Sequence, residues 1–396
     1  MRTLTAALLL TIFGMGATCF GQTGGQGPKL LLTPQRLRRL KRDCERQTVR
    51  WVNFEDRVRT VSDSPERGFE LALYYAVTGD DARGREAIDW ALKTNDRRQV
   101  ALVLDWCGPL LTDDARRKLV SRVSTPAATG LRDRLFSAIA SNRAIPDYTD
   151  AEKKAFINDL QRGAFMDPEK LYAACEFLMV YRAVERVDIR EDAALFFSEL
   201  PTEFLLSLKP DRAEHPEWMV HIAALALIAV DPNLQTSQFL QGWAMEDRQT
   251  IRDGPGVAYE LLWADPYLPG VGYQNLDPWS YDSDTGRLFA RTDWSSQACW
   301  IAVSPSGVED EHCPANWQHA TTRFGHLLLV PLNVECAELP SRMGNDLAIV
   351  WKLPPNRAVL FIADKQQHTA QADPAGMLRL GANITGRVCL PQEVKR

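Results

Sequence analysis

The stretch "GRLFARTDWSSQACWIAV", residues 286–303, alternates apolar and polar side chains in the manner of β-strands. It follows a long region in which apolar residues recur with helical spacing. Because a strand presents alternate residues to opposite faces, this alternation indicates a half-buried sheet. The sequence therefore predicts a change from helical to β-structure near residue 286.

Helix starts upstream of this point share one chemistry, an oxygen-bearing side chain followed by proline. Such a pair supplies an N-cap acceptor and a residue already fixed in the helical φ range. The pairs are Thr33-Pro34, Ser64-Pro65 and Asp167-Pro168. Gly79 followed by Asp80 predicts the end of one helix and the start of the next, a tight helical hairpin.

Apolar periodicity and capping signals predict about a dozen helices between Thr33 and roughly Trp263. They include segments near 97–111, 113–123, 127–143, 149–163, 168–184, 189–207, 217–229 and 235–251. Their broad apolar stripes have to be buried against one another. An array of helical hairpins of this kind forms either an open solenoid or a closed toroid.

The C-terminal part reads differently. Gly, Pro, Asp and aromatic residues are concentrated between 254 and 289, which predicts a linker, and strand patterns follow it. The expected strands are 287–291, 298–304, 326–334, 346–352 and 358–363. Five short strands predict a small sheet and not a full sandwich.

Composition limits the functional classes. The chain has 396 residues, 45% of them apolar, and a net charge of -5 without a basic stripe, so we do not expect a nucleic-acid partner. The first residues, "MRTLTAALLLTIFGMGATCFGQ", have the layout of a secretory signal, which predicts a secreted or periplasmic protein without stable membrane insertion. Cys107 and Cys175 lie in apolar helical contexts that are typical of buried free thiols.

The order of these parts resembles the heparinase II/III-like polysaccharide lyases. The resemblance rests on "KLLLTPQRLRRLKRD", "YAVTGDD", "ALVLDWCGPLLTDDARRKLV" and "GRLFARTDWSSQACWIAV". In the last phrase the residues that match the family pattern are Leu288, Phe289, Arg291, Asp293 and Trp294. The match covers residues 30 to about 330 and fades beyond about Val334.

The resemblance implies an α+β multidomain fold in which an (α/α) toroid precedes an antiparallel β-domain. The expected division is a signal peptide (1–21), a flexible lead-in (22–29), the toroid (30–263), a linker (264–285) and a partial β-sandwich (286–396). It also implies an acidic, uronate-containing polysaccharide as the partner, cleaved by β-elimination. The family places its active site in a groove of the toroid, which the β-domain would cover.

β-Elimination needs a base for the proton α to the carboxylate, a donor for the leaving oxygen, and a cation for the carboxylate. By position in the family pattern, His319 is the expected catalytic histidine, and His221 is a second candidate. His221 also fits a core histidine, because it lies in an apolar helix. Tyr172 and Tyr281 are the expected acid or base tyrosines, with Tyr259 as a further candidate, although Tyr172 also has helix-core spacing.

The expected substrate-binding residues lie around the junction of the two parts. Arg287 and Arg291 flank the strand at 287–291 and would bind a carboxylate through two hydrogen bonds each, the alternative being a solvated strand face. Tyr273, Asn275 and Trp279 lie in the aromatic linker, where rings suited to stacking on sugars are expected.

Three histidines predict a metal site, with zinc or calcium as the cofactor. His312, His319 and His326 are spaced seven residues apart, and the alternative interpretation is that they are surface or loop histidines. The chain lacks the His-x-His-x-Asp pattern of the family, because no Asp lies between Asp310 and Asp346.

Two other functional classes compete with a lyase. A glycoside hydrolase on the same helical scaffold would need two carboxylates across a groove, for which Asp105, Glu217 and Glu260 are the candidates. A non-catalytic carbohydrate-binding relative is favoured by the altered histidine pattern. Motifs for serine hydrolysis, phosphate binding and dinucleotide binding are absent from the sequence.

Overall fold

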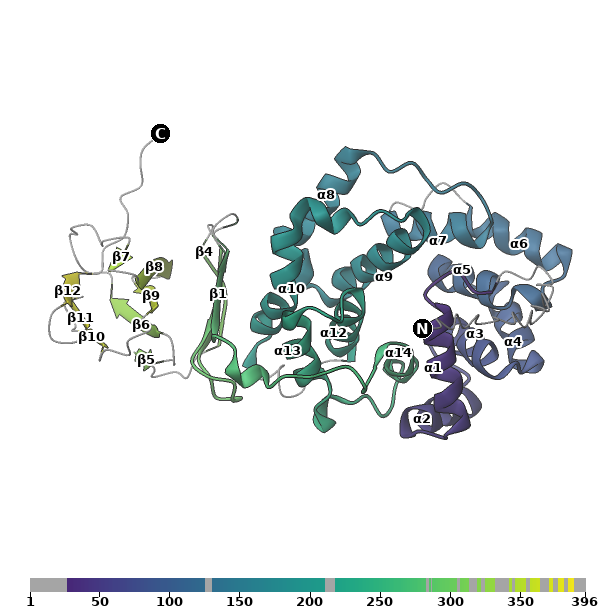
Figure 1. Cartoon of the computed structure of the whole chain (residues 1–396), viewed down its shortest axis with the longest axis horizontal. Coiled ribbons are helices and arrows are strands. Elements are labelled where there is room, and N and C mark those ends of the chain that lie inside the picture. The colour runs from purple at the N-terminus through teal and green to yellow at the C-terminus, as the bar shows by residue number, and fades with distance from the viewer. Residues whose placement is uncertain are drawn as a thin grey trace, which may run out of the picture.

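The computed structural model combines a helical part with a β part (Figure 1). It describes residues 27–124, 130–210, 218–282, 285 and 287–304, and beyond these the strand segments between 307 and 387. Thirteen α-helices lie in the described residues. They are α1 Pro34–Glu45, α2 Val49–Thr60, α3 Arg67–Thr78, α4 Asp81–Ala91, α5 Arg97–Trp106, α6 Asp113–Val123, α7 Leu131–Ala140, α8 Asp150–Gln161, α9 Pro168–Glu185, α10 Ala194–Ser207, α12 Trp218–Val230, α13 Gln235–Ala244 and α14 Gly256–Trp263.

Helix ends follow the predicted capping chemistry with one exception. Thr33 accepts the N–H of Arg36 at the start of α1, and Asp167 caps α9 in the same way. Gly79 ends α3 in the left-handed region at φ 76°, and Asp80 caps α4. The exception is α3, which begins at Arg67 without a side-chain cap, because Ser64 lies two residues before the N-cap residue Glu66 and its hydroxyl oxygen accepts the Glu66 N–H.

Several predicted helices are shorter than expected, because their last turns tighten into 3₁₀ geometry. The segment predicted at 97–111 divides into α5 and the 3₁₀ turn Gly108–Leu110. The segment predicted at 235–251 divides into α13 and the turn Asp247–Gln249. By contrast, α6 and α9 match their predicted ranges to within one residue.

Alternate helices contact one another in a continuous series. The series runs α3, α5, α7, α9, α12, α14, and α14 in turn contacts α3. The core lies among these helices and α13, where Phe69, Trp243 and Ala223 are fully buried. Cys107 and Cys175 are buried free thiols, which confirms the prediction for both. Among the helices of the described residues, none is both long and apolar enough to cross a lipid bilayer.

The described strands form three antiparallel sheets, with orders β1-β2-β3-β4, β5-β6-β9-β8-β7 and β10-β11-β12. Their bounds are β1 Trp279–Asp282, β2 Arg287–Arg291, β3 Trp300–Ser304, β4 Gly307–His312, β5 His319–Thr321, β6 Gly325–Pro331, β7 Arg342–Met343, β8 Asp346–Leu353, β9 Arg357–Ala363, β10 Ala370–Ala372, β11 Met377–Leu380 and β12 Ile384–Arg387. The five predicted strands correspond to β2, β3, β6, β8 and β9. The prediction of five strands in one small sheet was too low.

One of the missed strands lies inside the predicted linker. β1 pairs with β2 so that Trp279 lies opposite Ala290 and Asp282 opposite Arg287. The segment 264–285 is therefore not a linker over its whole length. Its four-residue strand stands next to turn-forming residues, which hide the alternation in the sequence.

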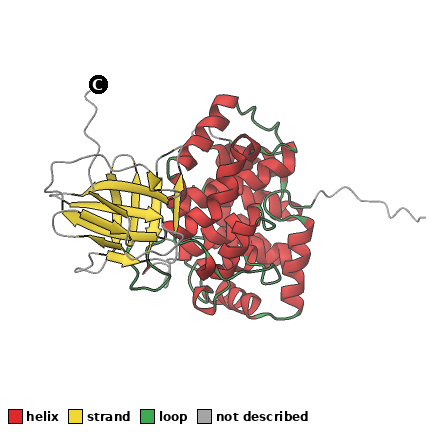
Figure 2. Cartoon of the chain, turned by 60° about the vertical axis from the view of Figure 1, so that its left-hand side comes forward, coloured by secondary structure: helices red, strands yellow, loops and turns green. Residues whose placement is uncertain are grey.

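The first sheet packs against the helical part through α10, which contacts β1 and β2 (Figure 2). The Trp300 indole N–H donates to the carbonyl oxygen of Leu206, the penultimate residue of α10, at 2.7 Å. The Arg287 guanidinium donates to the carbonyl oxygens of Gln161 and Arg162 at the end of α8. These bonds join the two parts of the chain at the change from helix to strand.

Candidate functional site

Polar side chains gather where the N-terminal halves of several core helices meet. Arg98 is the second residue of α5, and Tyr172 and Glu176 lie in the first half of α9. Tyr259 lies in the middle of the short helix α14, and Glu66 immediately precedes α3. We call these five residues the Arg98 cluster. The helix contacts described above bring them together from positions far apart in the sequence.

The Arg98 guanidinium is the centre of the cluster. It donates to the Tyr259 hydroxyl at 2.9 Å, to the Tyr172 hydroxyl at 3.0 Å and to Glu176 Oε1 at 2.6 Å. The Phe69 ring lies 5.4 Å from the guanidinium carbon. A buried cation is stable only when it is paired and hydrogen-bonded, and Arg98 meets both conditions.

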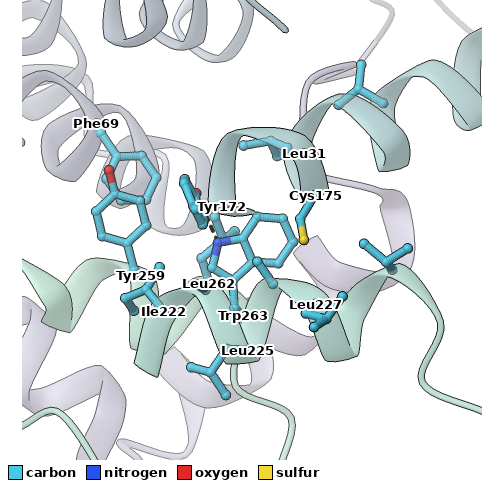
Figure 3. Packing of buried hydrophobic residues seen from close by; sticks show 14 of the residues in the cluster. Leu31, Phe69, Tyr172, Cys175, Ile222, Leu225, Leu227, Tyr259, Leu262 and Trp263 are labelled. Carbon is cyan, nitrogen blue, oxygen red and sulfur yellow. Dashed lines mark hydrogen bonds between the residues drawn. The ribbon is translucent and has the colours of Figure 1, made fainter. Parts of the chain in front are cut away.

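Each tyrosine hydroxyl also donates to a carboxylate. Tyr172 donates to Glu176 Oε1 at 2.6 Å. It also accepts the Trp263 indole N–H at 3.1 Å, the bond drawn as a dashed line in Figure 3. Tyr259 donates to Glu66 Oε2 at 2.6 Å. Burial, the largest cause, raises the pKa of both phenols well above 10. The neighbouring Arg98 therefore does not shift either tyrosine to the phenolate, and both carry their protons at neutral pH.

The two carboxylates have opposite pKa shifts. Burial raises the pKa of Glu66 above its usual value, and Arg98 and the Tyr259 hydrogen bond only partly oppose this. Burial acts in the same direction on Glu176, but Arg98 and Arg132 outweigh it and lower its pKa. Glu176 is thus the charged partner of the cation, and Glu66 is the more basic carboxylate.

The cluster reaches solvent through Glu66 and Arg132. Their side chains are 18% and 22% exposed, whereas the Glu176 side chain is fully buried. Arg132, near the start of α7, pairs with Asp133 at 2.8 Å and with Glu176 at 3.2 Å. A ligand that approached from solvent would meet Arg132 and Glu66 first, because Tyr172 and Tyr259 are buried.

His221 lies beside the cluster in a separate buried group of hydrogen-bonded side chains. Its Nε2 is 2.7 Å from Glu260 Oε2, and Glu260 also accepts from Arg50 Nε at 2.8 Å. Its exposed fraction is 1%, and within the described residues its Nδ1 has no hydrogen-bond partner. Glu260 directly follows Tyr259, so this group adjoins the cluster through α14. The arrangement matches the core-histidine alternative, because the imidazole does not reach solvent.

The residues expected to bind substrate at the junction are mostly packed. Tyr273 is buried with its ring 5.0 Å from the Trp294 ring, and Arg291 lies 4.2 Å above that same tryptophan. Arg291 is fully buried, and burial lowers its pKa to about 10. The exposed Asn275 and the half-buried Trp279 remain accessible from solvent. The alternative interpretation, that Arg287 and Arg291 lie on a solvated face of β2, is therefore wrong.

Arg287 also has a role different from the expected one. It is 8% exposed, and its guanidinium binds two backbone carbonyl oxygens of the helical part. Gly163 makes this possible, because its φ of 109° and missing side chain leave room for the guanidinium. A Cβ at this glycine would lie 2.7 Å from Arg287 Nη2. The side chain thus tethers the sheet to α8.

The histidines and tyrosine expected at the active site fall partly outside the described residues. His312 ends β4 opposite Trp300 and is half-buried. His319 and His326 lie on the paired strands β5 and β6, where Thr321 is opposite His326. The described side chains do not include those of His319 and His326. They also do not include that of Tyr281, which lies opposite Leu288. Within the described residues, no group of three His, Cys, Asp or Glu side chains is placed to hold a metal.

The carboxylates considered for a glycoside hydrolase are engaged elsewhere. Asp105 accepts the backbone N–H groups of Lys29 and Leu30 at 2.8 Å each, and burial raises its pKa to about 6. Glu260 belongs to the hydrogen-bonded group with His221 and Arg50. Glu217 lies outside the described residues. The described carboxylates of this set therefore hold the fold together.

A second feature, which the sequence analysis missed, is a groove between α1 and the segment that follows α14. Its volume is about 540 Å³. It is lined by Thr33, Gln35, Arg36, Arg39, Arg42, Asp43, Arg46, Ile228, Ala229, Pro232, Trp263, Asp265, Tyr267 and Leu268. The available signal was the spacing of four arginines by three or four residues, which places them on one side of a helix.

Comparison of the sequence with protein-family models and with curated proteins finds no match for this chain.

Proposed function

We propose that this chain is an exported, polysaccharide-lyase-like protein that binds uronate-containing polysaccharide and cleaves it by β-elimination at the Arg98 cluster. The proposal starts from the resemblance to the heparinase II/III-like lyases. The closed series of contacts from α3 through α14 and back to α3 supports an (α/α) toroid as the scaffold. The disulfide-bonded state of Cys299 is consistent with export, because disulfides persist in oxidising compartments.

One observation carries the proposal, namely two protonated phenols that share a single buried guanidinium. β-Elimination needs a proton donor for the leaving oxygen, and Tyr259 has its proton and lies next to the partly exposed Glu66. Arg132, at the solvent side, supplies the charge that neutralises a uronate carboxylate. These groups belong to one network, because Arg132 pairs with Glu176 and Arg98 joins Glu176 to Tyr259.

The proposed elimination consists of two proton transfers and the cleavage of one C–O bond. Glu66, whose raised pKa makes it the more basic carboxylate, takes the proton from the carbon α to the uronate carboxylate. The electron pair of that C–H bond forms a carbon–carbon double bond, and the neighbouring C–O bond breaks. Tyr259 gives its proton to the departing oxygen. His319, the base implied by the resemblance, is the alternative to Glu66.

The test is the ultraviolet absorbance of the unsaturated uronate product, measured on mature protein with a panel of uronate polysaccharides, with and without zinc or calcium. We expect product with at least one polymer, and we expect Tyr259→Phe to abolish it. Tyr75→Phe is the matched control, because Tyr75 lies outside the cluster on α3. Glu66→Gln and His319→Ala distinguish the two bases. Product formation that survives Tyr259→Phe would refute the assigned donor.

A non-catalytic carbohydrate-binding protein is the second candidate. The observation that favours it is the saturation of the cluster, since each tyrosine hydroxyl already has both a donor and an acceptor. Such a network rigidifies a core without needing to react. Absence of product across the panel, together with binding of the same polymers, would support this candidate.

A further inference from the structure

The groove beside α1 has a basic wall built by one helix. Arg36, Arg39 and Arg42 are spaced by three residues, and Arg46 follows Arg42 by four. Residues three and four apart are neighbours on a helix surface, so the four side chains line the same side of α1. With a rise of 1.5 Å per residue, they extend over about 15 Å along the groove.

The inner half of this wall is fixed by contacts with the end of α14. Arg39 pairs with Asp265 at 3.0 Å and donates to the Leu262 carbonyl oxygen at 2.7 Å. The Arg36 guanidinium lies 4.4 Å above the Trp263 ring and donates to the Leu31 carbonyl oxygen. The groove is therefore held open by contacts that are already formed, which lowers the cost of ordering it around a ligand.

The outer half carries charge without a counter-charge. Arg42 and Arg46 are exposed, and within the described residues neither guanidinium has a hydrogen bond or an ion pair. Four arginines and two aspartates line the groove, so two positive charges are in excess. Their position near the C-terminal end of α1 stabilises cations through the helix dipole. The helix dipole does not supply the planar hydrogen-bond acceptors, such as carboxylates, that a guanidinium binds best.

Aromatic and apolar groups complete the groove opposite the arginines. Tyr267 is 73% exposed, although a large ring at the surface of a groove is usually covered. Ile228, Ala229 and Leu268 are apolar residues of the same lining. The volume of about 540 Å³ lies within the range of pockets that hold ligands. A ligand that fits this surface has anionic groups on one side and a flat apolar face on the other.

We propose that this groove binds an acidic oligosaccharide. Its carboxylate or sulfate groups pair with Arg42 and Arg46, and the C–H face of one sugar ring stacks on Tyr267. The groove adjoins the Arg98 cluster through Trp263, whose indole N–H donates to Tyr172. It is a different site, because none of the five cluster residues lines it. It holds a polymer without cleaving it, so it does not depend on the elimination reaction.

The test is fluorescence anisotropy of a labelled oligogalacturonate titrated with the full mature chain. The variant is Arg42→Gln combined with Arg46→Gln. The matched control is Arg38→Gln combined with Lys41→Gln, which removes the same charge from exposed positions of α1 outside the groove lining. We expect the groove variant to bind at least about tenfold more weakly, because two charge-assisted contacts are lost, and the control to change less than about twofold.

Three results would overturn the proposal. An equal loss in both double variants would mean that general charge attraction alone binds the polymer. An unchanged affinity in the groove variant, with circular dichroism showing a folded chain, would place the polymer elsewhere. Tighter binding of a labelled oligothymidylate than of the oligogalacturonate, lost in the same variant, would assign the groove to nucleic acid instead.

Tyr267→Ala identifies the sugar-ring contact. We expect it to weaken oligogalacturonate binding severalfold and to leave the binding of inorganic polyphosphate unchanged, because polyphosphate has no ring. An equal loss for both probes would refute the stacking role. If the unsubstituted chain binds the labelled oligogalacturonate, the groove variant loses this binding, and no polymer of the panel gives an elimination product, the proposed reaction is refuted and the groove proposal stays intact.

Discussion

The Arg98 cluster and the groove beside α1 use the same two kinds of side chain, arginine and aromatic rings, in opposite states. In the cluster the guanidinium has three polar partners and is buried, whereas Arg42 and Arg46 in the groove are exposed and have none within the described residues. Saturation makes the cluster stable and rigid, and the lack of partners leaves the groove arginines free to bind an anion. The difference shows that side-chain composition alone does not reveal which arginines are free to pair with an added anion, since this depends on how many of their donors are already satisfied.

Replacing one arginine in each region is expected to give the largest difference between them in stability towards unfolding. Arg98→Met leaves the Glu176 carboxylate buried without its main cation, and we expect about 3–5 kcal/mol less stability towards unfolding. Arg42→Met should change stability by less than about 0.5 kcal/mol, because the side chain is exposed and unpaired within the described residues. Urea unfolding monitored by tryptophan fluorescence measures both. Equal effects would contradict the comparison.

A pH titration of stability gives the next largest effect. The pKa of Asp105 is about 6 in the folded chain, above the ordinary aspartate value of 3.8. The folded state therefore binds more protons than the unfolded state between about pH 4 and 6, and stability falls by about 2 kcal/mol as the pH rises through this window. The groove arginines keep their charge throughout.

Asp105→Asn isolates this contribution, because an amide oxygen can still accept from the Lys29 and Leu30 backbones. We expect the stability of the variant to lack the fall between about pH 4 and 6. The measurement is urea unfolding at closely spaced pH values for both proteins. Parallel curves for the two proteins would show that Asp105 does not titrate in this range.

A smaller effect follows from removing one hydroxyl from each region. Tyr259→Phe leaves one Arg98 donor and one Glu66 acceptor without a partner, and we expect a loss of about 1–3 kcal/mol. Tyr267→Phe should stay within about 0.5 kcal/mol, because the ring is mostly exposed. Thermal unfolding with the same protocol for both variants makes the comparison direct.

The smallest expected effect concerns the start of α1. Thr33→Ala removes the side-chain oxygen that caps this helix, at a cost of about 0.5–1 kcal/mol in a peptide-like, exposed setting. Thr33→Ser keeps the oxygen and is the control. We also expect Thr33→Ala to weaken oligogalacturonate binding slightly, because fraying at the cap loosens the wall that carries Arg36. Identical unfolding midpoints for the two variants would argue against the cap.

Local chemistry made most helix boundaries predictable. Thr33, Asp167 and Gly79 act within one turn of the chain, so the sequence around them contains the whole cause. The same reasoning gave the general order of helices followed by strands. It missed β1, because four residues are too few to establish an alternation beside turn-forming neighbours.

The candidate sites were much less predictable, because their contacts join distant residues. Arg98 and Glu176 are 78 positions apart, and no local pattern pairs them. Tyr172 was expected to be functional and does lie in the cluster, but its pKa shift follows from burial, which the sequence does not reveal. Arg287 and Arg291 have the strand positions expected of them, yet tertiary packing buries both.

The bond from Arg39 to the Leu262 carbonyl oxygen spans 223 positions of the chain, which has a consequence during synthesis. The helix that carries the arginines leaves the ribosome early, but the opposite side of the groove is made only when residues 262–268 appear. At about 5–20 residues per second, this interval lasts about 10–45 s. The arginines of α1 thus spend that time beside a partly made chain, and the groove is among the last features of the helical part to form.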